Sequence, residues 1–116
     1  MVSSTFPKTI SPTAMSNYRL TPDAQSDLIE IRRYTLQQWG SAQSQKYLSE
    51  LRKTIRLLAE TPALGKARPE VGMNVLSFPY VSHIIYFIVH EKQLLIFGVL
   101  HKRMVPVNHL AEREVI

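Results

Sequence analysis

Four histidines are the main titratable side chains of this chain, and two of them fall near the ends of predicted strands. These are His83 and His101, whereas His90 lies in a predicted turn and His109 in the C-terminal segment. A histidine can donate or accept a proton near neutral pH, so its placement at a strand end is compatible with acid–base chemistry. The alternative is a hydrogen-bonding or surface role, and the residue types leave both open.

A basic cluster follows the last predicted strand directly. It reads His101-Lys102-Arg103 and is followed by Met104. Three donor-rich side chains at the end of a rigid strand could hold a phosphate or an acidic segment of a partner. The alternative is that they only make the strand end soluble. Other cations are Arg52, Lys53 and Arg56 on a predicted helix, and Lys66 and Arg68 in the long loop after it.

An RNA-cleaving site is one chemistry that these side chains could support. Such a site needs a general base, a general acid and cations that stabilise the charge developing on the phosphate. Whether the required groups converge in space is not visible in the sequence. The residues that supply the required types are Tyr80, Tyr86, His83, His101, Lys66, Arg68 and Arg103.

The composition excludes several other classes of function. The 116 residues include no cysteine, which excludes disulfide scaffolds, thiol nucleophiles and cysteine-based metal sites. There is no nucleotide-binding glycine motif and no metal-ligand spacing, so we expect neither cofactor nor metal. No apolar run is long enough for a transmembrane helix, and we expect a cytoplasmic protein. The net charge of +5 points to an anionic partner.

The chain divides into a short tail and one predicted domain. Residues 1–14 are mostly Ser, Thr and Pro and show no periodicity, which predicts a flexible N-terminal tail. Residues 15–116 are the size of a single domain. Met15 opens the patterned part and is an alternative to Met1 as the start of the protein.

Two helices are predicted after a short strand at residues 17–20. Thr21 can cap a helix that has Pro22 at its first position and extends to about residue 39, with Gly40 breaking it. The second helix runs over residues 42–60, with Ser41 as its expected N-cap. A break this short forces an antiparallel helical hairpin. The predicted apolar stripes are Ala24, Leu28, Ile31, Thr35 and Trp39, then Leu48, Leu51, Ile55 and Leu58.

The second half of the chain has the period of two that strands require. Strands are predicted at residues 75–78, 81–89 and 94–100, the last of them apolar throughout and therefore central. A short helix is predicted near residues 111–114. The fold class is α+β, in the order β-α-α-β-β-β: a strand, a helical hairpin, and a three-stranded antiparallel meander that covers the apolar stripe of the hairpin.

At this point the chain resembles the RelE/ParE toxin superfamily, and in particular its ParE branch. The resemblance covers about residues 16–110 and implies the same β-α-α-β-β-β fold. It is carried jointly by Tyr18-Arg19-Leu20-Thr21, Ala24, Asp27-Leu28, Ile31, Tyr34, Trp39-Gly40, Tyr47, Leu51, Pro62, Gly65, Ser82-His83-Ile84-Ile85-Tyr86-Phe87, Val99-Leu100-His101, Met104 and His109-Leu110.

The resemblance implies the toxin of a type II toxin–antitoxin pair. ParE-type toxins inhibit DNA gyrase by binding, whereas RelE-type relatives cut mRNA on the ribosome with Lys and Arg residues and a C-terminal Tyr. This chain has no Tyr after Tyr86, so we expect a gyrase-directed binder that is not an enzyme. The target-facing residues would be His101, Lys102, Arg103 and Met104, with His83 adjacent. A ribonuclease using His83, His101, Arg103, Lys66 and Arg68 is the alternative.

A third interpretation is an inactive relative that only binds an antitoxin. It is motivated by two departures from the family pattern: no Arg lies between Gly72 and Phe78, and Val105 replaces an Asp. All three interpretations imply a ParD-like antitoxin with an acidic C-terminal segment, in a hetero-oligomer that associates with DNA through the antitoxin. Candidate contact positions, if they are exposed, are the apolar residues Leu36, Tyr47 and Leu57, and packing in the core is the slightly favoured alternative for each.

Overall fold

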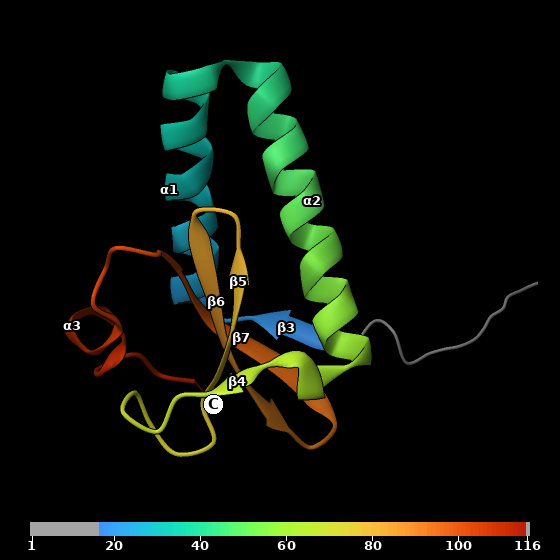
Figure 1. The fold of residues 1–116 in the computed structure, drawn as a ribbon, viewed down its shortest axis with the longest axis vertical. Coiled ribbons are helices and arrows are strands. Elements are labelled where there is room, and N and C mark those ends of the chain that lie inside the picture. Colours follow the sequence, from blue (N-terminus) through green and yellow to red (C-terminus); the bar gives the residue numbers. More distant parts are fainter. Residues whose placement is uncertain (1–16, 116) are drawn as a thin grey trace, which may run out of the picture.

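The computed structural model describes residues 17–115 and confirms the predicted α+β class (Figure 1). The predicted tail over residues 1–14, and Met15, lie outside the described residues. The elements are β3 (Tyr18–Leu20), α1 (Pro22–Trp39), α2 (Ser41–Glu60), the 3-10 turn η2 (Pro62–Leu64), β4 (Lys66–Ala67), β5 (Leu76–Tyr80), β6 (His83–His90), β7 (Gln93–His101) and α3 (Pro106–Leu110).

The helical hairpin forms because strong start and stop signals flank α1. The side chain of Thr21 accepts a hydrogen bond from the backbone N–H of Ala24 at 3.2 Å, and Pro22 occupies the first turn. Gly40 has a φ of 88°, a conformation that side chains disfavour, and it ends α1 and begins α2 in one residue. The prediction that Ser41 caps α2 is wrong, because Ser41 is already the first helical residue and Gly40 is the cap.

The sheet has five strands in the order β3-β7-β6-β5-β4. Strands β5, β6 and β7 form the predicted antiparallel meander, and β3 adds to β7 in parallel, with Tyr18 opposite Leu94. The two-residue strand β4 was not predicted, because two residues carry no periodicity; it pairs with β5 through Lys66 and Ser77. Strand β7 is buried over residues 94–100, as its apolar sequence predicts.

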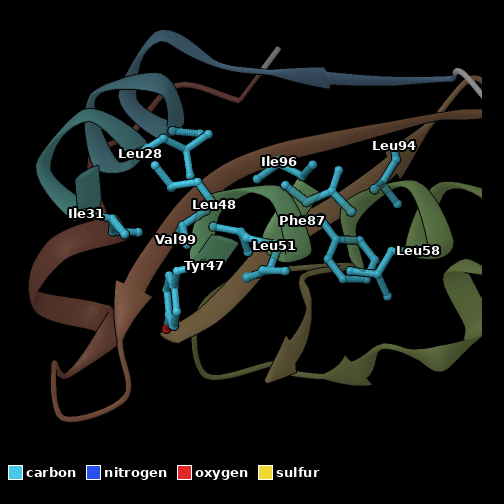
Figure 2. Close-up of a cluster of buried hydrophobic side chains, with 13 residues drawn as sticks. Leu28, Ile31, Tyr47, Leu48, Leu51, Leu58, Phe87, Leu94, Ile96 and Val99 are labelled. Atoms are coloured by element: carbon cyan, nitrogen blue, oxygen red, sulfur yellow. The ribbon is translucent and has the colours of Figure 1, made fainter. Parts of the chain in front are cut away.

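The hairpin packs on one face of this sheet and forms the main core (Figure 2). The predicted α2 stripe is confirmed: Leu48, Leu51, Ile55 and Leu58 are all buried, and they meet Ile85, Phe87 and Ile96 from the sheet. The predicted α1 stripe is buried from Ala24 to Thr35, but Trp39 at its end is 47% exposed. No helix in the described part of the chain is long and apolar enough to cross a bilayer.

A smaller cluster covers the opposite face of β7, under α3. It contains Tyr86, Phe97, Leu100 and Leu110. The predicted helix near residues 111–114 is wrong: the helix lies earlier, at Pro106–Leu110, because Pro106 suits a first helical position and Leu110 is buried against the sheet. Gly98 allows this approach, since a Cβ there would lie 2.7 Å from the Leu110 side chain.

Replacing Val81 by asparagine is expected to stabilise the fold by about 1 kcal/mol. Val81 has a φ of 49°, which is strained for a β-branched residue, and its side chain is 71% exposed, so little packing is lost. Asparagine tolerates this conformation, as Asn74 does at a φ of 64°. Urea unfolding measures the gain. Val105→Asn is the control, because Val105 is also exposed but has a φ of −82°.

Candidate functional site

A cavity of about 390 Å³ lies where α1, the end of β7 and the C-terminal segment meet. This volume is in the range of small binding sites. Three of the predicted target-facing residues line it together, namely His83, His101 and Met104. The other lining residues are Asp27, Glu30, Ile31, Tyr34, Val99, Leu100, His109 and Arg113.

His83 is buried at one side of this cavity and is held in a defined orientation. Its Nδ1 lies 2.8 Å from the hydroxyl of Tyr47, which also accepts a hydrogen bond from the backbone N–H of Ser82 at 3.3 Å. Since the tyrosine hydroxyl has one proton, donating it to Nδ1 satisfies both groups and leaves the histidine proton on Nε2. Burial, and then the neighbouring His101, lowers the pKa of His83 to about 4, so the ring is neutral at pH 7.

His101 lies opposite His83 across the β6–β7 pair, with ring centroids 5.5 Å apart. Its Nδ1 accepts a hydrogen bond from the backbone N–H of Arg103 at 3.1 Å. The backbone N–H of Lys102 donates to the carbonyl of Ser82 at 2.9 Å. These bonds fix the turn after β7, so the exposed side chains of Lys102 and Arg103 extend from an ordered backbone beside the cavity.

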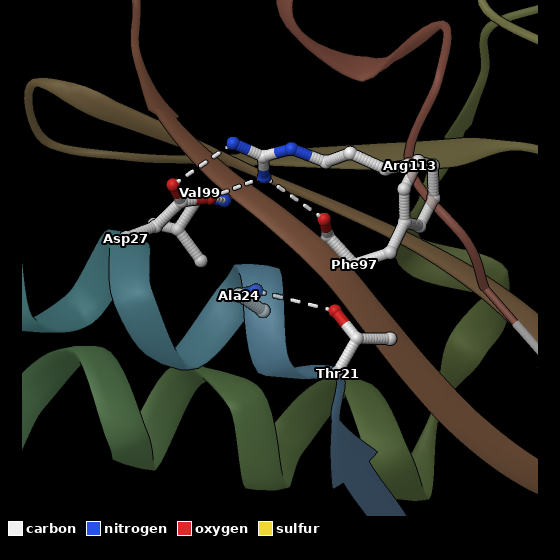
Figure 3. A network of polar contacts seen from close by, with 6 residues as sticks. All are labelled: Thr21, Ala24, Asp27, Phe97, Val99 and Arg113. Carbon is white, nitrogen blue, oxygen red and sulfur yellow. Dashed lines mark hydrogen bonds and ion pairs between the residues drawn. The ribbon is translucent and has the colours of Figure 1, made fainter.

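An ion pair between Asp27 and Arg113 forms another side of the cavity (Figure 3). Arg113 donates to both carboxylate oxygens, at 2.7 and 3.1 Å, and to the carbonyl of Phe97 at 3.1 Å. Asp27 also accepts the backbone N–H of Val99 at 2.9 Å. Strand β3 pairs with β7 only over residues 94–96, so these two side chains satisfy backbone groups of β7 beyond the end of β3.

The residues of the ribonuclease alternative do not all lie together, because Lys66 and Arg68 are apart from the histidines. His83 and Tyr47 meet on the helical face of the sheet. Arg68 instead lies over the ring of Tyr86, at 5.6 Å, and Tyr86 belongs to the cluster on the opposite face. Lys66 pairs with Ser77, and Ser77 pairs with Tyr86, so Lys66 is on the side of Tyr86 as well. The sheet therefore separates both loop cations from the histidines.

The three residues expected to contact an antitoxin differ in exposure. Leu57 is 47% exposed and Leu36 is partly buried, so both remain candidates. For Tyr47 the alternative of core packing holds, because the residue is only 8% exposed and its ring packs against Tyr80, with centroids 5.0 Å apart. Burial raises the pKa of Tyr47, which keeps its hydroxyl protonated.

The sequence alone does not indicate the role of Arg113 or the hydrogen bonds of Tyr47. Arg113 is near the end of the chain in a charged stretch that is typical of a solvated helix, and nothing local indicates its partner. Asp27 carried a signal, since an acidic residue on the otherwise apolar side of a helix needs a partner. Among residues 17–115, no three acidic or histidine side chains are arranged to bind a metal ion.

Comparisons with known proteins agree on one family. Residues 18–106 match the family described as "ParE toxin of type II toxin-antitoxin system, parDE". The chain is 33% identical over 96 residues to Toxin ParE1 of Caulobacter vibrioides, covering 83% of this chain and 99% of that protein. It is 31% identical over 100 residues to Toxin ParE of Escherichia coli, covering 85% and 97%.

A solved structure has the same fold. It is titled "Chromosomal ParDE TA system from P. aeruginosa" and superposes with a TM-score of 0.66 over 77% of this chain and 98% of that chain. The sequence identity between the two chains is 19%, so this similarity supports the fold and not the details of the site.

Proposed function

The chain belongs to the ParE toxin family of type II toxin–antitoxin systems, and from this premise we propose that it inhibits DNA gyrase by binding. The observation that carries the proposal is the ordered basic turn at Lys102 and Arg103. Both side chains are exposed, and within residues 17–115 neither forms an ion pair. A gyrase–DNA assembly presents dense phosphate charge that such a turn can contact.

The proposed mechanism is inhibition without bond-making chemistry by the toxin. His101 and Met104 would contact the target beside the basic turn, with His83 behind them. The separation of Lys66 and Arg68 from His83 argues against the ribonuclease alternative, because general acid–base groups and phosphate-binding cations must reach the same phosphate. We also propose that an acidic ParD-like antitoxin neutralises the toxin in the cytoplasm, in a hetero-oligomer that associates with DNA through the antitoxin.

A supercoiling assay with purified gyrase and relaxed plasmid tests this function. We expect the toxin to block supercoiling and to leave cleaved DNA–gyrase complexes. Complete supercoiling at a large excess of toxin would overturn the proposal. Primer extension on cellular mRNA after toxin induction tests the ribonuclease alternative separately, since site-specific cuts with gyrase unaffected would assign the toxin to that activity.

The double substitution Lys102→Ala/Arg103→Ala is expected to raise the toxin concentration needed for half-inhibition of supercoiling about tenfold. Two charged contacts to phosphate are lost, while the backbone bonds of the turn remain. The matched control is Arg52→Ala/Arg56→Ala, which removes two exposed cations from α2 and thus the same net charge. Equal weakening by both pairs would mean that overall charge, and not this turn, determines inhibition.

A further inference from the structure

We propose that Tyr47 is a positioning residue for the turn at Lys102 and Arg103. Its buried hydroxyl orients this turn through two separate sets of contacts. This inference rests on the proposed function, because it assigns a task to the turn at Lys102 and Arg103. Tyr47 belongs to α2 and touches neither of these two residues in any hydrogen bond of the described chain. Its influence on them passes through Ser82 and His83.

The first route runs through the turn between β5 and β6. The hydroxyl of Tyr47 accepts the backbone N–H of Ser82 at 3.3 Å. The carbonyl of the same residue, Ser82, accepts the backbone N–H of Lys102 at 2.9 Å. Ser82 therefore connects the turn between β5 and β6 to the turn after β7. Tyr47 fixes Ser82 by accepting its backbone N–H.

The second route runs through the two histidine rings. The hydroxyl of Tyr47 lies 2.8 Å from Nδ1 of His83, whose ring packs edge-on against His101 with centroids 5.5 Å apart. Nδ1 of His101 accepts the backbone N–H of Arg103 at 3.1 Å. Both basic residues thus have their backbone N–H groups fixed by chains of contacts that begin at one hydroxyl.

The residues around Tyr47 hold its side chain in one position. The residue is 8% exposed, and its ring packs against those of Trp39 and Tyr80, with centroids 5.5 and 5.0 Å away. Tyr80 also donates its hydroxyl to the backbone carbonyl of Tyr47 at 2.7 Å. The turn needs such a support, because Val81 next to Ser82 has a left-handed backbone that costs energy to maintain.

The test compares Tyr47→Phe with Tyr80→Phe. Both substitutions remove one tyrosine hydroxyl from the same aromatic cluster. The hydroxyl of Tyr47 makes two hydrogen bonds, with Ser82 and His83, whereas the hydroxyl of Tyr80 makes one, to the backbone carbonyl of Tyr47. Amide hydrogen exchange followed by NMR measures the two turns, and the supercoiling assay measures inhibition. A thermal melt of each variant shows that the fold is retained.

In Tyr47→Phe we expect exchange at the Ser82, Lys102 and Arg103 amides to accelerate roughly tenfold, while amides at the centre of β6 and β7 stay protected. We expect half-inhibition of gyrase to need roughly fivefold more toxin. Tyr80→Phe should change both measurements much less, because its hydroxyl supports the backbone of Tyr47 and contacts neither Ser82 nor His83. A merely structural role would instead produce the same exchange pattern in both variants.

Two results would overturn the inference. One is unchanged exchange at Lys102 and Arg103 in Tyr47→Phe, and the other is faster exchange with unchanged inhibition of gyrase. Failure of the unmodified toxin to inhibit gyrase is a distinct result, which overturns the proposed function. In that case the exchange data alone decide whether Tyr47 orders the turn.

Discussion

Replacing Arg113 by alanine is expected to lower the free energy of unfolding by about 3 kcal/mol, because a mostly buried carboxylate loses its cation. The side chains of Arg113 and Asp27 are 18% and 14% exposed, so water cannot fully replace the lost contacts. The carbonyl of Phe97 loses its hydrogen bond from Arg113 as well. Urea unfolding monitored by circular dichroism measures the change.

Arg33→Ala is the matched control for this prediction. Arg33 pairs with Glu30 at 2.7 Å, the same distance as the shorter contact of Arg113, but those side chains are 62% and 68% exposed. Its loss should cost less than about 1 kcal/mol. Arg113→Lys should fall between the two, since lysine keeps the charge but not the two-pronged geometry. Similar losses for Arg33→Ala and Arg113→Ala would contradict this account of the ion pair.

Lowering the pH from 7 to 5 is expected to destabilise the fold by about 2 kcal/mol through His83 alone. The pKa of His83 is lowered to about 4 in the folded protein, first by burial and then by His101. The unfolded chain therefore binds a proton near pH 6.5 that the folded chain binds only near pH 4. Stability from this group is complete above pH 6.5 and is lost progressively as the pH falls toward 4.

Urea unfolding at several pH values checks this dependence, with His83→Asn as the comparison. The asparagine side chain can place an oxygen near the position of Nδ1 and accept the hydroxyl of Tyr47, but it does not titrate. The variant should lose most of the pH dependence between 4.5 and 6.5. An equally steep profile in the variant would mean that another group is responsible.

The elements with a strong local period could be predicted from the sequence, and the long-range pairings could not. The stripe of α2 and the apolar run of β7 fixed the hairpin and the central strand. The parallel pairing of β3 with β7 joins residues 18–20 to residues 94–96, and nothing in either segment specifies its partner. The composition of residues 111–114 predicts a helix there, but the helix lies at Pro106–Leu110. Arg113 instead forms an ion pair with Asp27, which is distant in the sequence.

The site was predictable in part for the same reason. His83 and His101 were expected at strand ends, and antiparallel pairing of those ends brings them together. The face on which a side chain lies depends on register, which the sequence did not determine for the loop before β5. Residue types alone therefore place Lys66 and Arg68 with the histidines, although the sheet separates them.

The contacts of Asp27 bear on how the protein is made in the cell. Its two partners, Val99 and Arg113, follow it by 72 and 86 residues, so the ion pair cannot form until synthesis has passed residue 113. Strand β3 likewise cannot pair until the residues of β7 have been synthesised. Contacts this distant in sequence form late, because the intervening loop must close first. A chain that ends before Arg113 therefore lacks the cation of Asp27 and the donor to the carbonyl of Phe97.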